Sequence, residues 1–450
     1  MASVQVSELA QYVGQQVELR GWLYNRRGSG KLLFMQVRDG SGIVQCVVSR
    51  QDVSEGAFET ARRIGNESSL VVRGRASEDK RSSLGVEIHV REIELIQEAR
   101  DYPIQITEDV PNIDKLLDRR HLWIRSRRPH AILRVRSEVI QAVRDFYYQR
   151  GFVTFDAPIF TPASCEGEST LFEVPYFDQT CYLTQSGQLY GETGAMAFGK
   201  VLVFGPTFRA EKSKTRRHLT EFWMVEPEVA FIDLAGVMDL AEAQVQYVVG
   251  RALERCKEEL KTLERDTAIL SRVTERFPRV HYKEAQALLQ NLKAEFTASQ
   301  DPDKQKLGKD ILSQGPGADL GAADETAIGL HFGQCVCIHH YPRDVKAYYM
   351  KADPAEPQYA LGVDVIAPEG VGEIIGGGQR EDNLEVLQAQ ITKHNIAPET
   401  VDWYVDLRRY GSVPHGGFGM GVERCVQWIT GCAHVRETIP FPRTIYRLNP

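Results

Sequence analysis

The sequence lacks the features that would place a chain in a membrane or outside the cell. Its 450 residues contain no apolar run of about eighteen residues, the length that a membrane-spanning helix needs. The first residues, Met-Ala-Ser-Val-Gln-Val, show no signal-peptide pattern. The eight cysteines follow no paired spacing, which favours buried thiols in a reducing compartment over a disulfide framework. These absences predict a cytoplasmic protein with no membrane attachment.

A strong excess of charge of either sign is also missing. The net charge is −7, so any nucleic-acid partner must be bound by local basic patches rather than by a global field. Hydrophobic residues make up 42% of the chain and charged residues 26%, the proportions of an ordinary globular protein. The length allows two or three domains, each with its own core.

A convincing metal-binding motif is absent as well. The nearest candidate is Cys335-Val-Cys337-Ile-His339-His340. Its alternation of apolar and polar residues is typical of a β-strand that leads into Tyr341-Pro342. We therefore predict no zinc site.

The pattern along the chain predicts an α+β protein with two domains. Residues 1–100 contain five short alternating strands with turn signals, typical of a five-stranded oligonucleotide-binding (OB-fold) barrel. Residues 101–130 carry prolines and an arginine cluster and are interpreted as a hinge, whose arginines either touch nucleic acid or are simply solvated. Residues 131–450 form the second domain, beginning with an amphipathic helix over 131–149 and holding a helical and loop insertion around 235–345. Within it, 300–325 is expected to be a surface loop or an insertion, and the remainder to be strands ending in a glycine-rich turn and a short helix.

The most informative segment is 208–228, which is predicted to form two strands flanking a basic loop. Side chains alternate along a strand, so Arg209 and Glu211 share one face of the first strand, and Phe222 and Glu226 share one face of the second. An arginine suits a phosphate, an aromatic ring suits a stacked base and a carboxylate suits an exocyclic amine. The segment indicates a nucleotide site; the alternative is an exposed hairpin held by salt bridges.

Two glycine-rich segments accompany this hairpin. One, 372–380, combines Glu373 and Arg380 with backbone that a ligand can approach closely. The other, 416–424, is expected to be a glycine loop that opens a short helix containing Arg424. Neither matches a P-loop or a dinucleotide-binding fingerprint. A mainly antiparallel nucleotide site is therefore expected.

In the first domain, Phe34 lies on the polar face of a predicted strand, opposite Leu33 and Met35. An aromatic ring in that position can stack on an unpaired base. The alternative is one exposed phenylalanine on an ordinary barrel.

Together, the helix and strand before Pro158, the segment 208–228 and the segment leading to Arg424 resemble the three signature motifs of class II aminoacyl-tRNA synthetases. Within that class the chain resembles the asparaginyl-tRNA synthetases along its whole length, including the anticodon-binding barrel. The resemblance implies ATP, L-asparagine and tRNA(Asn) as substrates, a homodimer with Pro158 at its interface, and Mg²⁺ bound with ATP. Asparagine would be activated as asparaginyl-adenylate and then transferred to tRNA, with release of pyrophosphate and AMP.

The resemblance also implies a role for individual residues. Arg209, Glu373 and Arg424 would be the catalytic residues, with Glu373 carrying Mg²⁺ on the phosphates. The ATP-binding residues would be Arg209, Glu211, Arg217, His218, Phe222, Glu373, Gly421 and Arg424. Asparagine would be bound by Glu166, Ser186, Gln188, Glu226 and Arg380, with Gln188 expected on a strand. The anticodon would meet Arg27, Phe34 and Gln45. Gly376 departs from the serine that is frequent in aspartyl relatives.

Selection of asparagine over aspartate is expected to depend on Glu226 and Arg380. Arg380 would contact the side-chain oxygen, whereas Glu226 would accept a hydrogen bond from the amide NH₂ and repel a second carboxylate. Aspartyl relatives carry aspartate at that position and a lysine where this chain has Gly191. Glu226 could instead be a structural carboxylate paired with an arginine such as Arg209. The alternative functions are an aspartyl or non-discriminating aspartyl/asparaginyl enzyme, an adenylating relative that does not charge tRNA, and a non-catalytic RNA-binding protein.

Overall fold

The computed structural model describes residues 1–82, 84–105, 113–162, 165, 170–213, 215–315 and 317–450. The chain divides into two compact units, Met1–Leu116 and Leu117–Pro450. Among the helices in these described ranges, none is long and apolar enough to cross a membrane.

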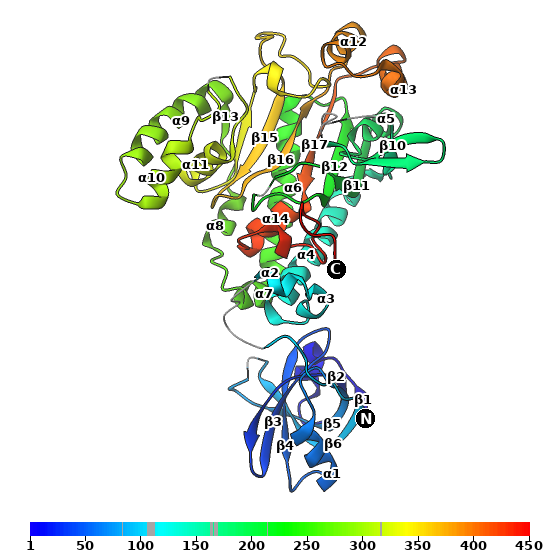
Figure 1. Cartoon of the computed structure of the whole chain (residues 1–450), viewed down its shortest axis with the longest axis vertical. Helices are drawn as coiled ribbons and strands as arrows, with labels where there is room; N and C mark the ends of the chain where they lie inside the picture. Colours follow the sequence, from blue (N-terminus) through cyan, green and yellow to red (C-terminus); the bar gives the residue numbers. More distant parts are fainter. Residues whose placement is uncertain (83, 106–112, 163–164, 166–169, 214, 316) are drawn as a thin grey trace. The chain divides into compact units, whose positions relative to one another are not determined.

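The first unit is a closed barrel of five strands, as predicted. These are β2 (Gln16–Ser29), β3 (Leu32–Arg38), β4 (Ile43–Ser49), β5 (Ser69–Glu78) and β6 (Val86–Gln97). The strand order is β2-β3-β4-β6-β5, and the additional pairing of β2 with β5 closes the barrel. The alternation along β3 buries Leu33, Met35 and Val37 inside and leaves Phe34 on the outer surface, partly exposed. Helix α1 (Glu55–Arg63) lies between β4 and β5 in the chain (Figure 1).

The second unit is built on an eight-stranded mixed sheet. Its order is β13-β14-β15-β16-β17-β12-β11-β7, antiparallel except for the outermost pair at each edge. The strands are β7 (Val153–Thr154), β11 (Lys200–Phe208), β12 (Glu221–Ala230), β13 (Arg279–His281), β14 (Val336–His339), β15 (Gly362–Ala367), β16 (Gly372–Gln379) and β17 (His415–Gly421). A separate small sheet joins β8 (Phe160–Thr161), β10 (Gln179–Leu183) and β9 (Glu173–Tyr176).

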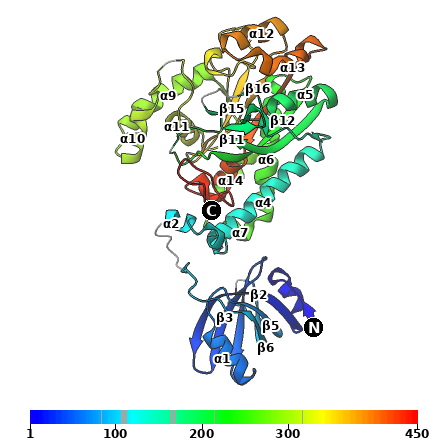
Figure 2. The same ribbon diagram turned by 45° about the vertical axis from the view of Figure 1, so that its right-hand side comes forward.

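Two long helices, α4 (Arg127–Tyr148) and α6 (Leu234–Arg255), cover one face of the large sheet (Figures 1 and 2). Val139 of α4 and Val245 of α6 share the main hydrophobic core with Val225 of β12. Because side chains alternate along a strand, the neighbours Met224 and Glu226 face the other side of the sheet. The second face is therefore the one left open for a ligand.

Further helices surround this frame. Helices α9 (Tyr282–Thr297), α10 (Pro302–Asp310) and α11 (Ala322–Phe332) pack on their own core at the β13–β14 edge. Helices α5 (Gln188–Phe198), α12 (Leu384–Lys393) and α13 (Pro398–Arg409) share another hydrophobic core and lie together, away from the β13–β14 edge of the sheet (Figure 1). The short helices are α2 (Ile113–Leu117), α3 (Arg120–Trp123), α7 (Lys257–Thr262), α8 (Ala268–Ser271) and α14 (Val422–Thr430).

Several expectations about these segments are wrong. The expected loop 300–325 contains α10, which begins with an Asp301 cap and Pro302. The expected strands after 345 are interrupted by α12 and α13, and the glycine run 416–421 lies in strand β17 rather than in a loop. Within 235–345, the range expected to hold an insertion, α6 packs on the main core and β14 belongs to the central sheet, whereas α9, α10 and α11 pack on a core of their own.

The segment interpreted as a hinge, 101–130, also differs from the expectation. It contains α2 and α3, and α4 begins within it at Arg127. Arg120, one of the arginines expected either to touch nucleic acid or to be solvated, is only 1% exposed. Its guanidinium donates to the carbonyl oxygens of Glu437, Ile439 and Pro440 at 2.8–3.0 Å. Arg120 therefore anchors the C-terminal segment.

Candidate active site

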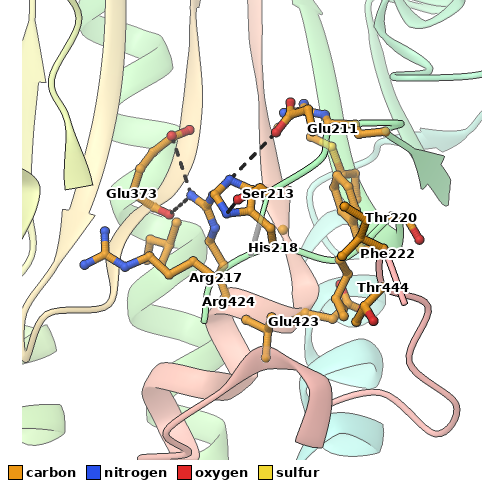
Figure 3. A pocket seen from close by; sticks show the side chains of 18 residues that line it. Glu211, Ser213, Arg217, His218, Thr220, Phe222, Glu373, Glu423, Arg424 and Thr444 are labelled. Carbon is orange, nitrogen blue, oxygen red and sulfur yellow. Dashed lines mark hydrogen bonds and ion pairs between the residues drawn. The ribbon is translucent and has the colours of Figure 1, made fainter. Parts of the chain in front are cut away.

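A cavity on the open face of the sheet brings together all the residues predicted to bind ATP. Its lining comes from strand β12, from described residues of the segment between β11 and β12, and from β16, β17 and the start of α14 (Figure 3). The predicted residues in its lining are Arg209, Glu211, Arg217, His218, Phe222, Glu373, Gly421 and Arg424. Sequence reasoning missed Thr444 and Ile445, which also line it. Those two come from the C-terminal segment, and no local pattern indicated its return to the sheet.

Arg424 and Glu373 form one end of this cavity (Figure 3). The Arg424 guanidinium donates to the Glu373 carbonyl oxygen at 2.7 Å and lies 3.6 Å from its carboxylate. Arg217 is fixed beside them, because it donates to Glu325 at 3.0 Å and to Thr326 at 2.6 Å. Two guanidinium groups held by neighbouring elements present a fixed positive charge, which suits phosphate oxygens.

The same lining also contains an aromatic ring, Phe222, and a carboxylate, Glu211. The Arg209 guanidinium lies 5.5 Å from the centre of the Phe222 ring. The Glu211 carboxylate is 3.9 Å from His218 Nε2, and His218 Nδ1 is 3.1 Å from the Ser213 hydroxyl. Burial lowers the pKa of His218 and the nearby Arg424 lowers it further, so the imidazole is neutral at pH 7. A neutral imidazole can act as a hydrogen-bond donor without adding charge.

A second cavity adjoins the first and contains most of the predicted asparagine-binding residues. Ser186, Gln188, Glu226 and Arg380 all line it. The two cavities share four lining residues, Arg209, Met224, Glu373 and Gly419. A group bound in one cavity therefore meets a group bound in the other beside Arg209. Sequence reasoning missed Lys346, Tyr349, Met350 and Asp364 in this lining.

Glu226 is buried at the bottom of this second cavity, with 3% of its surface exposed. One carboxylate oxygen accepts from the Gly187 amide at 2.9 Å, and the other accepts from the Ser186 hydroxyl. An ionised carboxylate only accepts hydrogen bonds, so Glu226 offers acceptor oxygens to this cavity. Glu226 and Arg380 line the same cavity, as predicted.

Arg380 is held by Glu228, a second carboxylate of strand β12, which also carries Glu226. Its guanidinium makes a two-pronged contact with Glu228, at 2.5 and 3.3 Å, and both side chains are buried. Burial raises the pKa of Glu228 to about 7, against the opposing effect of Arg380. A Cβ added at Gly191 would lie 3.1 Å from Glu228 Cγ, so the glycine leaves room for this carboxylate. The orientation of the Arg380 guanidinium is thus fixed before any ligand binds.

Three predicted residues need separate comment. Gln188 is not on a strand, because it begins helix α5. Glu166 lies outside the described residues. Pro158 is exposed, lines neither cavity and lies in the connection between β7 and β8.

The lining of the second cavity includes a group of carboxylates suited to a cation. A Cβ built on Gly376 would lie 2.6 Å from Glu373 Oε1 and 3.3 Å from Asp364 Oδ1, so both oxygens face the gap that this glycine leaves. Burial raises the pKa of Asp364 to about 6; Lys346, 2.8 Å away, opposes the rise and Glu373 adds to it. Mutual repulsion of this kind is relieved by a bound cation, and oxygen ligands suit Mg²⁺.

These residues do not form a complete metal cage. In the described part of the chain no group of three or more His, Cys, Asp or Glu side chains could hold a metal by itself. Mg²⁺ commonly takes one or two carboxylates and completes its shell with water and phosphate oxygens. Glu373 and Asp364 fit that pattern. A charged residue within the apolar run of β15 was the signal that could have identified Asp364.

On the barrel, the predicted anticodon residues lie together on the outer surface of β2, β3 and β4. Arg27 donates to Gln45 at 3.1 Å, and its guanidinium lies 5.6 Å from the centre of the Phe34 ring. Gln45 in turn donates to Glu87 at 2.9 Å. A partly exposed ring flanked by an arginine and an amide can stack on a base and bind its edge.

Comparisons with known proteins show the family of this chain. The family described as tRNA synthetases class II (D, K and N) matches residues 112–445, and the family described as OB-fold nucleic acid binding domain matches residues 17–96. The asparagine--tRNA ligase of Sorangium cellulosum is 53% identical over 450 residues, covering 99% of each chain, and that of Thermus thermophilus is 49% identical over 448 residues, again covering 99% of each. The chain therefore belongs to the class II tRNA synthetases and, within them, to the asparagine--tRNA ligases.

Solved structures give the same picture. Asparaginyl-tRNA synthetase from Pyrococcus horikoshii, complexed with asparaginyl-adenylate, superposes with a TM-score of 0.91 at 41% identity, covering 99% of each chain. The enzyme from Entamoeba histolytica, also in complex with asparaginyl-adenylate, gives a TM-score of 0.86 at 29% identity, with 100% of this chain and 99% of that chain covered. A putative aspartyl-tRNA synthetase from Leishmania major is more distant, with a TM-score of 0.80 at 26% identity, covering 100% of this chain and 94% of that chain.

Proposed function

We propose that the enzyme joins L-asparagine to tRNA(Asn) in two steps, through asparaginyl-adenylate. The observation that carries this proposal is the junction of the two cavities at Arg209 and Glu373. A reaction between the carboxylate of one substrate and the α-phosphate of another requires both groups at one place, beside a positive charge. Arg209 provides that charge at the junction.

In the first step the asparagine carboxylate attacks the α-phosphorus and pyrophosphate leaves. Arg209 would bridge the carboxylate and the α-phosphate, lowering their mutual repulsion. Arg217, His218 and Arg424 would bind the outer phosphates, and Phe222 would stack on adenine, opposite Arg424, with Glu211 accepting from its amino group. In the second step the terminal hydroxyl of tRNA takes the acyl group and AMP leaves. The protein contributes positioning and electrostatic stabilisation rather than a covalent intermediate of its own.

Mg²⁺ would be bound by Glu373 and Asp364 together with ATP. When bound, it would neutralise phosphate charge. The two carboxylates facing the gap at Gly376 support this assignment. Glu325 accepts from the Glu373 backbone amide at 3.2 Å, and burial together with the Glu373 carboxylate raises the pKa of Glu325 to about 7.

Asparagine would be selected by Glu226 and Arg380. The fixed fork of Arg380 suits the side-chain carbonyl oxygen, and the acceptor capacity of Glu226 suits the amide NH₂. Gln188, and by resemblance Glu166, would bind the α-ammonium group. An aspartyl or non-discriminating enzyme is the second candidate, and it is disfavoured because a second carboxylate would meet Glu226 at the bottom of the cavity.

The cluster of Arg27, Phe34 and Gln45 would bind the anticodon. Their mutual contacts on the outer barrel surface support a single base-binding patch. The barrel would therefore contribute to tRNA charging without taking part in adenylate formation.

We also propose a cytoplasmic homodimer with Pro158 at its interface. Beside Pro158, the small sheet exposes several apolar side chains, with Phe160 51% and Phe177 93% accessible. The Tyr176 ring contacts both, tilted at 5.7 Å from the centre of the Phe160 ring and edge-on at 4.9 Å from that of Phe177. Contiguous exposed apolar groups favour association. Phe177→Asp should shift the protein towards monomer in sedimentation velocity, and an unchanged sedimentation coefficient would contradict this interface. The eight buried thiols agree with a reducing compartment.

The proposal is tested by ATP–pyrophosphate exchange with each of the twenty amino acids, with and without tRNA. Exchange with asparagine alone, in the absence of tRNA, is expected. Equal exchange with aspartate would favour a non-discriminating enzyme. Exchange without subsequent charging of tRNA would favour an adenylating relative, and no exchange at all would favour a non-catalytic RNA-binding protein.

A further inference from the structure

A group of charged side chains lies buried behind the asparagine cavity and has no role in the reaction described above. Glu192 of α5 and Arg408 of α13 are in contact at 2.8 Å, and both side chains are 0% exposed. His415, at the start of β17, lies 2.8 Å from the same carboxylate oxygen of Glu192. The Tyr404 hydroxyl reaches both oxygens of that carboxylate, at 2.8 and 2.9 Å. Buried charges are costly unless they are fully paired, so this arrangement requires an explanation beyond packing.

Glu192 is ionised in this environment. Burial alone would raise its pKa, but Arg408, His415 and Arg380 together hold the pKa of Glu192 well below its usual range. An ionised carboxylate can only accept hydrogen bonds. Every group that contacts Glu192 must therefore present a donor to it.

One of the groups in contact with Glu192 is Gln188. The Gln188 amide nitrogen lies 2.9 Å from Glu192 Oε1, one helical turn further along α5. Because Glu192 only accepts, the amide must turn its NH₂ towards Glu192, and its carbonyl oxygen is then directed away. Gln188 lines the asparagine cavity, so the group offered to a ligand is an acceptor. An acceptor is what a substrate ammonium group requires.

We propose that Glu192 is a positioning residue for the amino-acid substrate. It orients the Gln188 amide so that the carbonyl oxygen faces the α-ammonium group of asparagine. Arg408, His415 and Tyr404 hold the Glu192 carboxylate in place and in its ionised form. This inference rests on the proposed function, because it takes the α-ammonium group as the ligand of Gln188.

The substitution Glu192→Gln reverses the orientation of the amide. The carbonyl oxygen of the new side chain would remain with the donors Arg408 and Tyr404, and its NH₂ would face Gln188. The Gln188 amide would then rotate to accept from it and would direct its own NH₂ at the ammonium group. Loss of a hydrogen bond to a charged group corresponds to about tenfold to a hundredfold in affinity. The KM for asparagine should therefore rise by about that factor, with the KM for ATP unchanged.

A double-mutant cycle in ATP–pyrophosphate exchange tests this mechanism. If Glu192 acts through Gln188, then Glu192→Gln has no further effect on the KM for asparagine in a Gln188→Met background. An equal rise in both backgrounds would overturn the proposal, as would an equal rise in the KM for ATP. Glu437→Gln is a matched control, since Glu437 is 1% exposed and paired with Arg128 at 3.1 Å, outside both cavities.

Succinamic acid, which is asparagine without its amino group, provides a second measurement. Glu192→Gln should leave the inhibition constant of succinamic acid unchanged while it raises the KM for asparagine. Equal weakening of both would show a general distortion and would overturn the proposal. Should Glu192→Gln not fold, Tyr404→Phe removes one donor from Glu192 and should raise the KM for asparagine a fewfold, but not in the Gln188→Met background. Absence of asparagine-dependent exchange in the wild type would instead reject the proposed function.

Discussion

Replacement of Glu226 by glutamine changes the charge at the bottom of the asparagine cavity with little change of shape. In the wild type both carboxylate oxygens accept hydrogen bonds, from the Gly187 amide at 2.9 Å and from the Ser186 hydroxyl. A glutamine can keep its carbonyl oxygen on Gly187 and direct its NH₂ to the hydroxyl oxygen of Ser186, which is able to accept. The fold around β12 should therefore be preserved.

The expected effect on selectivity is large. An aspartate in the cavity would place its carboxylate about 4 Å from that of Glu226, and at an effective dielectric constant near 20 the repulsion is about 4 kcal/mol. Glu226→Gln removes this repulsion from aspartate. The same change takes a charged acceptor from the asparagine amide, which costs about 1.5–3 kcal/mol. The repulsion alone corresponds to nearly a thousandfold, so the asparagine-to-aspartate ratio of kcat/KM should fall by at least about a thousandfold.

The assay is ATP–pyrophosphate exchange with each amino acid, compared with a Glu221→Gln control. Glu221 begins the same strand and lines neither cavity, so its substitution should leave the ratio as in the wild type. A ratio that is unchanged in Glu226→Gln would remove Glu226 from the account of specificity. It would leave Arg380 as the residue to examine.

Three further predictions concern the barrel and the cation site. Phe34→Ala should raise the KM for tRNA by about tenfold to a hundredfold, the value of one stacked base, and spare pyrophosphate exchange; equal losses in both assays would show that Phe34 is needed for folding. Gly376→Ala should raise the Mg²⁺ concentration for half-maximal exchange, because the added Cβ would lie 2.6 Å from Glu373 Oε1; an unchanged Mg²⁺ requirement would argue against a cation there. Burial raises the pKa of Asp364 to about 6, so the folded chain binds the proton of this carboxyl group more tightly than the unfolded chain does. The contribution of Asp364 to the free energy of unfolding therefore falls as pH rises from about 4 to 6. Over that range exchange should rise as the carboxylate ionises, and a flat pH–activity profile from pH 5 to 7 would contradict its role.

Local alternation predicted the barrel and the second strand of the hairpin, because the face of a strand on which a side chain lies follows directly from its position. The expectation that Arg209 and Glu211 share a face of the first strand is wrong, because β11 ends at Phe208. The same reasoning identified Phe34 on the outer face of β3, and Phe222 with Glu226 on the open face of β12. In these cases the sequence pattern and the tertiary environment agree.

The failures have identifiable causes. Gly417 suggested a loop, yet it lies in strand β17. Glycine is required at this position because a Cβ would lie 2.1 Å from the Pro227 carbonyl oxygen of the neighbouring strand β12. Helices α12 and α13 could have been recognised from the Asn383 cap and from Pro398 in the first turn.

The contacts of Glu192 could not be predicted in this way. Its partner Arg408 is 216 residues distant in the sequence, and only the tertiary structure brings the two together.

The structure of the enzyme bound to a non-hydrolysable analogue of asparaginyl-adenylate tests the central claim most directly. The account predicts that the carboxamide lies between Glu226 and Arg380, with the phosphate beside Arg209 and adenine on Phe222. A carboxamide that contacts neither Glu226 nor Arg380 would contradict it.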